Sequence, residues 1–179
     1  MMGNMGGMMK KVQEMQAKMQ EMQKELENKT VEDNLMISLS NRRTFFFALT
    51  YDYNEQEKMR VAETAELVNL DVSLDKKAGD LSHGQKQWLE IGMLLAQDPM
   101  LLLIDEPAAG MTSSERLSTV KLLKDVAKTR SVIVVEHDMD FVRNLNCGVT
   151  VLHEGSVLAE GYLDHISKNE DVIEVYLGR

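Results

Sequence analysis

The N-terminal part of the chain shows a repeating pattern of apolar residues. Between Lys10 and Asn28 no glycine or proline interrupts a stretch dominated by helix-forming residues. We therefore expect a Met/Gln-rich amphipathic or coiled-coil helix within residues 1–29. Its seam could pack on another surface of the protein, or it could pair two copies. The seam residues alternate in spacings of four and three and are Met8, Val12, Met15, Met19, Met22 and Leu26.

The stretch that follows carries one capping signal. Residues 31–54 show no strong period. Asn54 followed by Glu57 matches a capping box, which predicts that a helix begins there and continues to about residue 69. An aromatic cluster lies inside the stretch without a period, at Phe45, Phe46 and Phe47.

A second helix is predicted after a polar turn. Ser82 is a favourable N-cap, and residues 85–97 have the pattern of an amphipathic helix. Pro99 ends the pattern because proline disfavours helical geometry in the residue before it. The apolar face of this helix is expected to be buried through Trp88, Ile91, Leu94 and Leu95.

Beyond residue 99, short apolar runs alternate with amphipathic stretches. Residues 100–104 form a continuous apolar run, as expected for a strand buried on both faces. Strand–helix–strand alternation predicts an α/β fold whose parallel sheet has an antiparallel edge. The expected elements are a strand at 100–104, a helix capped by Thr112 or Ser113 and ending near Lys128, a strand at 131–135, a short helix at 138–145, a hairpin around Glu154-Gly155 and a helical tail from Tyr162.

Composition limits the partners and the compartment. The formal net charge is −9, which argues against general electrostatic binding to DNA or to anionic lipid. The single cysteine, Cys147, cannot form an internal disulfide, and this fits a reducing compartment. No apolar run approaches the roughly 20 residues that span a bilayer. We therefore expect a cytoplasmic protein.

Three short segments carry candidate chemistry, and the first is a helix start. A small hydroxyl and a glycine lie where the second predicted helix begins. Such an end presents unpaired N–H groups and a partial positive charge, which favour a phosphate. The same pattern is also a common helix cap without further function. The segment reads Leu81, Ser82, His83, Gly84, Gln85.

The other two segments follow the two predicted parallel strands. Asp105 and Glu106 end the first strand, at the edge where α/β folds bind ligands. Asp105 could hold a hydrated Mg²⁺, and Glu106 could orient or deprotonate a water molecule. His137 follows the second strand and could contact a phosphate or that water, although a single histidine there is often structural.

The order and spacing of these segments resemble ABC ATPases over about residues 30–179. The resemblance implies a partial P-loop NTPase fold with a parallel sheet and a helical subdomain, divided into residues 30–98 and 99–179. It implies ATP and Mg²⁺ as cofactors, with Asp105 as the magnesium residue, Glu106 as the catalytic glutamate and His137 as the switch histidine. Residues 108–112 correspond to the loop that crosses the dimer interface in that family. The signature motif that faces ATP corresponds to Ser82, His83, Gly84 and Gln85.

Two departures from the usual family pattern narrow the resemblance. His83 stands where the family's signature usually has glycine, and Thr112 is nearest to the slot of the usual interface-loop aspartate. These features are similar to the urea and branched-chain amino acid uptake group, with the urea type as the nearest match. The resemblance therefore implies a second ABC ATPase subunit and transporter membrane subunits as partners, and a peripheral position at the inner face of the membrane.

One part of the family pattern does not occur. An ABC site needs a glycine-rich loop that ends in Gly-Lys-Ser/Thr, and this sequence contains no Gly-Lys pair. We therefore expect an ABC-type ATPase by family that does not hydrolyse ATP alone and can at best offer its signature to an intact subunit. A sheet without the phosphate-loop strand should also expose leucine, isoleucine and valine.

Residues 1–28 resemble the first helix of YbaB-type nucleoid-associated proteins, which bind DNA as small dimers. The lysines and glutamates of this segment nearly balance, so the segment alone does not indicate strong DNA binding. Three hypotheses result: a partial ABC ATP-binding subunit, an interaction protein that self-associates through residues 8–26, and, last, a DNA-binding protein.

Overall fold

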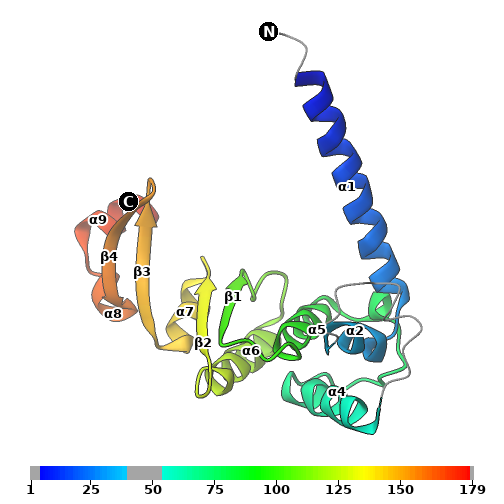
Figure 1. The fold of residues 1–179 in the computed structure, drawn as a ribbon. Helices are drawn as coiled ribbons and strands as arrows, with labels where there is room; N and C mark the ends of the chain where they lie inside the picture. The colour runs from blue at the N-terminus through cyan, green and yellow to red at the C-terminus, as the bar shows by residue number, and fades with distance from the viewer. Residues whose placement is uncertain (1–4, 40–53, 178–179) are drawn as a thin grey trace. The chain divides into compact units, whose positions relative to one another are not determined.

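A computed structural model describes residues 5–39 and 54–177 (Figure 1). The chain divides into two compact units, Met1–Pro99 and Met100–Arg179. Its division into the segments 1–29, 30–98 and 99–179 stays a prediction. The aromatic cluster Phe45, Phe46 and Phe47 lies outside the described residues.

The first unit is helical. Its described elements are α1 (Met5–Asn28), α2 (Val31–Leu39), α4 (Glu55–Leu67), the 3₁₀ turn η1 (Ala78–Asp80) and α5 (His83–Leu95). The helix expected from the heptad pattern is α1, and the capping box of Asn54 and Glu57 is present at the start of α4. Helix α2 lies where the sequence showed no strong period. The helix is too short to show a clear helical period in the sequence. The buried residues on its inner face are Val31, Asn34, Leu35 and Met36.

Helices α2, α4 and α5 pack into a small bundle. Gly92 on α5 is a point of close approach: a Cβ there would lie 3.2 Å from Leu35 Cδ2 and 3.3 Å from Val68 Cγ2. Leu35 and Ile91 are fully buried beside this contact. The expected burial of Leu94 was wrong, since 41% of it is exposed. Leu94 lies outside the buried face of α5, which includes Leu89, Ile91 and Leu95.

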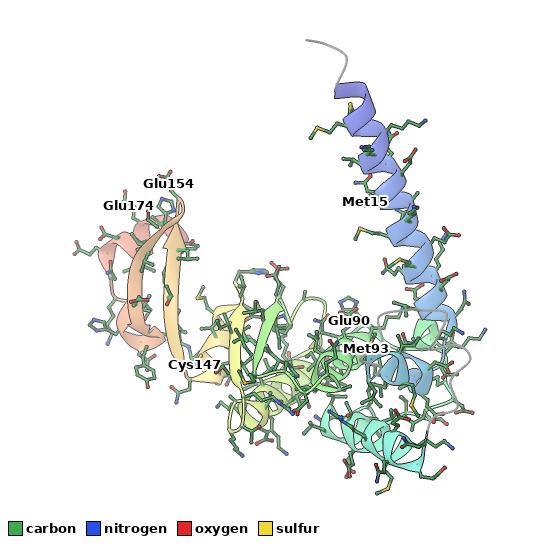
Figure 2. The ribbon with its side chains drawn as sticks, in the orientation of Figure 1. Met15, Glu90, Met93, Cys147, Glu154 and Glu174 are labelled. Carbon is green, nitrogen blue, oxygen red and sulfur yellow. The ribbon has the colours of Figure 1, made fainter. Side chains whose placement is uncertain are left out.

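The C-terminal turn of α1 is fixed to this bundle. The buried side chain of Asn34 donates from Nδ2 to Leu26 O at 3.1 Å, in the last turn of α1, and to Thr30 O at 2.8 Å, just after the helix. Ala78 N donates to Lys29 O at 2.9 Å, so η1 lies against the same turn. The remainder of the seam, including Met15, projects into solvent (Figure 2).

The second unit contains two separate two-stranded sheets. Strands β1 and β2 are parallel, with Leu101 beside Ser131 and Asp105 beside Val135. Strands β3 and β4 form an antiparallel hairpin, so the expected antiparallel edge is not part of the parallel sheet. The elements are β1 (Leu101–Asp105), α6 (Ser113–Val126), β2 (Ser131–Val135), α7 (Met139–Leu145), β3 (Gly148–His153), β4 (Ser156–Tyr162), α8 (Leu163–Ile166), α9 (Glu170–Val172) and the π-helical turn η2 (Ile173–Leu177).

The hairpin turn is located where the sequence predicted it. Glu154 and Gly155 both have positive φ, at 48° and 77°, which is the geometry of a tight turn that matches strand twist. Glu154 lies at the tip of the hairpin (Figure 2). The helical tail is present as α8, α9 and η2, with Ile166 and Val172 buried.

Strand β1 is buried on one face only, which corrects the prediction of burial on both faces. Leu102 and Ile104 are buried, whereas 48% of Leu101 and 67% of Leu103 is exposed. On β2, Ile133 and Val135 are exposed as well. Within the described part of the chain, cover is present on only one side of this strand pair. The exposure of leucine, isoleucine and valine on this sheet was expected.

Candidate functional site

The N-terminus of α5 is shaped by a reciprocal cap. Gln85 N donates to Ser82 Oγ at 3.2 Å, and Ser82 N donates to Gln85 Oε1 at 3.0 Å. Both side chains therefore support the first turn of the helix, as a capping box does. Ser82 N-caps the helix, as the sequence predicted.

The capped start of α5 still has a hydrogen-bond donor that could bind an anion. Ser82 Oγ accepts one hydrogen bond and retains its own hydroxyl hydrogen, which it can donate. Ser82 and His83 are exposed, whereas Gly84 is buried. A helix N-terminus carries a partial positive charge, so an exposed hydroxyl at this position suits a phosphate oxygen.

The ends of β1 and β2 place two predicted site residues together. Glu106 N donates to Val135 O at 2.9 Å, so the pairing of the strands extends to the residue after β1. The Nδ1 atom of His137 lies 3.2 Å from Glu106 Oε1. Asp105 is the last residue of β1 and is exposed beside this pair.

Glu106 has an unusual backbone conformation. Its φ is 47°, which is uncommon for a residue with a side chain and costs free energy that neighbouring contacts must offset. The bond from Glu106 N to Val135 O is one such contact. The conformation sets the direction in which the Glu106 carboxylate leaves the strand.

Glu136 is the main site residue for which the sequence pattern predicts no role. Its side chain is only 2% exposed. Oε1 accepts from Ala108 N at 2.9 Å, and Oε2 accepts from His137 N at 3.0 Å and from Asp138 N at 3.2 Å. One buried carboxylate therefore connects the loop after β1 to the loop after β2. The available signal was an acidic residue directly after an apolar strand.

Asp138 and Arg116 form a second connection that the sequence did not reveal. Arg116 Nη1 lies 2.5 Å from Asp138 Oδ2. Asp138 Oδ1 caps α7 by accepting from Asp140 N and Phe141 N, each at 3.0 Å. The backbone N–H of Phe141, followed by Arg116, holds the pKa of Asp138 below its usual value because these groups stabilise the carboxylate.

The loop residues surround a depression of about 320 Å³ within the second unit. Among the described residues, no group of three or more His, Cys, Asp or Glu side chains is arranged to hold a metal ion. Asp105 alone still suits Mg²⁺, which uses one or two carboxylates and takes its other ligands from phosphate and water. The lining residues are Ala108, Ala109, Gly110, Met111, Arg116, Glu136, His137 and Asp138.

The structure thus groups the predicted residues in two sets. Asp105, Glu106 and His137 belong to Met100–Arg179, where Glu106 and His137 are in direct contact. Ser82, His83, Gly84 and Gln85 belong to Met1–Pro99, on α5 and its cap. A joint action of the two sets on one nucleotide stays a prediction.

Comparison with known proteins identifies the family. The sequence profile described as "ABC transporter" matches residues 4–109 of the chain, which is more than half of its length. The chain belongs to the ABC transporter family. The profile match begins within the first residues, so it includes α1 as well as the cap of α5 and the Asp105-Glu106 pair.

Two relatives of this ABC chain are ATP-binding proteins, and both are named for branched-chain amino acid transport. It is 34% identical over 159 residues to the high-affinity branched-chain amino acid transport ATP-binding protein BraF of Pseudomonas aeruginosa, covering 86% of this chain and 61% of that protein. It is 33% identical to the probable branched-chain amino acid transport ATP-binding protein LivG of Archaeoglobus fulgidus, covering 86% of this chain and 62% of the relative. The chain therefore spans about three-fifths of the length of these relatives.

Solved structures confirm the expected fold class. The ADP conformation of MJ1267, an ATP-binding cassette of an ABC transporter, matches with a TM-score of 0.73 and 27% identity. That match covers 87% of this chain and 65% of the other. A nucleotide-free ATP-binding cassette from an ABC transporter matches with a TM-score of 0.74 and 26% identity. The fold is that of an ABC ATPase cassette.

The comparisons leave two finer predictions open. The relatives described above are named for branched-chain amino acids, so transport of urea stays a prediction, as does the resemblance of residues 1–28 to nucleoid-associated proteins. Among the described helices, none combines the length and the apolarity that crossing a membrane requires.

Proposed function

We propose that the chain supplies the signature and the hydrolytic residues of an ATP-binding subunit in an ABC importer for branched-chain amino acids. The family supports the first part of this proposal, and the names of the relatives support the substrate class. Urea is the alternative substrate, because its uptake group shares the His83 departure. The expected partners are a second ATP-binding subunit and the membrane subunits of the transporter.

Each hydrolytic residue at the strand ends has a proposed role. Asp105 would hold Mg²⁺, which neutralises phosphate charge when it is bound. Glu106 would accept a proton from the attacking water, and His137 would position the Glu106 carboxylate through their 3.2 Å contact. Glu136 keeps both loops in place through its three backbone contacts.

We further propose that these 179 residues do not hydrolyse ATP by themselves. The sequence has no Gly-Lys pair, so it offers no glycine-rich loop of backbone amides to hold the triphosphate against Asp105 and Glu106. The signature can still act in trans, with Ser82 donating to a phosphate that an intact subunit holds. The observation that carries the proposed hydrolytic roles is the contact of Glu106 with His137 at the ends of two parallel strands.

Three measurements on the purified chain test this proposal. Equilibrium dialysis with Mg·ATP should show no saturable retention, and ATP turnover should not exceed that of a Glu106→Gln control. In the trans arm, the chain is added to an intact BraF-type subunit and should change its ATP turnover. Tight, saturable uptake of nucleotide by the chain alone would contradict the claim that it is not competent by itself.

The trans arm has a matched pair of variants. Ser82→Ala removes the signature hydroxyl together with the cap of α5, and it should abolish the effect on the intact subunit. Asn54→Ala removes an equivalent capping box from α4 outside the signature, at a similar cost of about 1 kcal/mol. If both variants reduce the effect equally, Ser82 acts only through stability and the trans role is lost.

The exposed seam of α1 favours a second role as an interaction helix. Its methionines are 60–70% exposed from Met8 to Met22, which is unusual for a row of apolar side chains. DNA binding through the same helix ranks last, because its lysines and glutamates nearly balance. Retention on DNA that falls steeply with salt would restore that alternative.

A further inference from the structure

The seam of α1 has the geometry of one half of a coiled coil. The apolar row occupies the a positions Val12, Met19 and Leu26 and the d positions Met8, Met15 and Met22. The exposed fraction is 52% for Val12 and 65% for Met15. Most of the stability of a helix in a protein comes from packing its amphipathic face, and pairing would bury this row.

We propose that two copies of this chain pair through α1 as an antiparallel coiled coil. The inference rests on the interaction role proposed for α1 and not on its nucleotide chemistry. In this register Met15 meets the partner's Met19, and Val12 meets the partner's Met22. Leu26 then meets the partner's Met8, so one continuous apolar layer runs along both helices.

The charges beside the seam favour the antiparallel direction. In an antiparallel pair the g positions face each other, and they are Lys11, Lys18 and Glu25. Lys11 then faces the partner's Glu25 at both ends of the pair, while Lys18 faces its own copy at the centre. In a parallel pair Lys11 and Lys18 would instead face the partner's Gln16 and Gln23. The antiparallel register thus has two opposite-charge contacts against one like-charge contact, and the parallel register has none of either.

The packing of the bundle agrees with this direction. The bundle joins α1 at its C-terminal turn, through the bonds of Asn34 to Leu26 O and Thr30 O. Two parallel helices would bring two bundles side by side at the same end. Two antiparallel helices place them at opposite ends, about 30 Å apart for a helix of this length.

Charge exchange in the full chain tests the register. Light scattering after size exclusion should give a dimer for the wild type, against a chain mass of 20.3 kDa. Lys11→Glu and Glu25→Lys should each weaken the dimer about tenfold, because two attractive contacts become repulsive. The double variant K11E/E25K should regain wild-type affinity. An equimolar mixture of the two single variants should form the mixed dimer in preference to either homodimer.

Cysteine pairs determine the direction independently. In a C147S background, Met15→Cys mixed with Met19→Cys should form a disulfide between chains under mild oxidation, and Met15→Cys alone should not. Rapid self-linking of Met15→Cys would show a parallel pair and overturn the register. A wild-type chain that stays monomeric at all concentrations in light scattering would overturn the pairing itself. Either failure leaves the ATP measurements unaffected, so the two proposals are separable.

Discussion

The bundle of α2, α4 and α5 and the strand pair β1–β2 bury their apolar side chains to different degrees. Leu35 and Ile91 in the bundle are almost inaccessible, and Gly92 lets α5 approach both neighbouring helices. Leu103 on β1 and Val135 on β2 are mostly exposed. The bundle is closed by helices that follow one another along the chain, whereas a parallel strand pair needs cover on two faces. Neighbouring segments of the chain are therefore enough to bury the core of the bundle, but they do not cover both faces of the strand pair.

The largest expected effect is on the bundle. Leu35→Ala should lower the free energy of unfolding by about 3 kcal/mol, because it removes a fully buried side chain and leaves a cavity at the α2–α5 contact. The only tryptophan, Trp88, lies on α5, so its fluorescence reports the unfolding of this unit in denaturant. Leu103→Ala on the exposed face of β1 is the control and should leave the tryptophan transition unchanged. An equal shift of the tryptophan transition in both variants would contradict the difference in burial between the bundle and the strand pair.

The next effect is on the loops of the second unit. Glu136→Ala should destabilise this unit by about 2–3 kcal/mol, because three backbone N–H groups lose a buried carboxylate acceptor. Hydrogen exchange should rise at residues 108–112 and at His137 and Asp138, whereas the Trp88 transition should stay in place.

Glu136→Gln is the matched variant for this loop. It keeps the shape of the side chain but replaces one acceptor oxygen with a donor, so its effect should be smaller than that of Glu136→Ala. Unchanged exchange in both variants would contradict the connecting role of the carboxylate.

A smaller effect depends on pH. Asp138→Ala removes a cap of α7 and the ion pair with Arg116, at a cost of about 1–2 kcal/mol. The folded pKa of Asp138 is lowered, so its contribution is complete at pH values above its ordinary pKa and is lost as the pH falls through the folded pKa. Stability of the second unit, followed by circular dichroism, should therefore decrease less in acid for the variant than for the wild type. An identical decrease in both would remove Asp138 as the cause.

Local signals in the sequence predicted local features of the structure. The capping box of Asn54, the N-cap of Ser82 and the turn at Glu154-Gly155 each depend on residues close together in the chain, and all three are present. The order of strands and acidic residues also predicted the family. In contrast, the contact of Glu136 with Ala108 joins residues 28 positions apart, and no local pattern indicates it. The apolar run of β1 predicted burial on both faces, and this was wrong for a similar reason, since an apolar run does not show what covers it. The exposure of its leucines was expected only from the missing phosphate-loop strand.

The smallest effect on stability has the most direct bearing on the comparison. Leu103→Thr on the exposed face of β1 keeps a strand-forming, branched side chain and should change the free energy of unfolding by less than about 0.5 kcal/mol. It should nevertheless raise the concentration at which the chain stays soluble, because exposed leucine on an open strand pair favours association between copies. Static light scattering over a concentration series measures this, and Leu102→Thr on the buried face is the control, expected to destabilise rather than solubilise. If Leu103→Thr were as destabilising as Leu102→Thr, both faces of β1 would be buried in solution, and the strand pair would be as closed as the bundle.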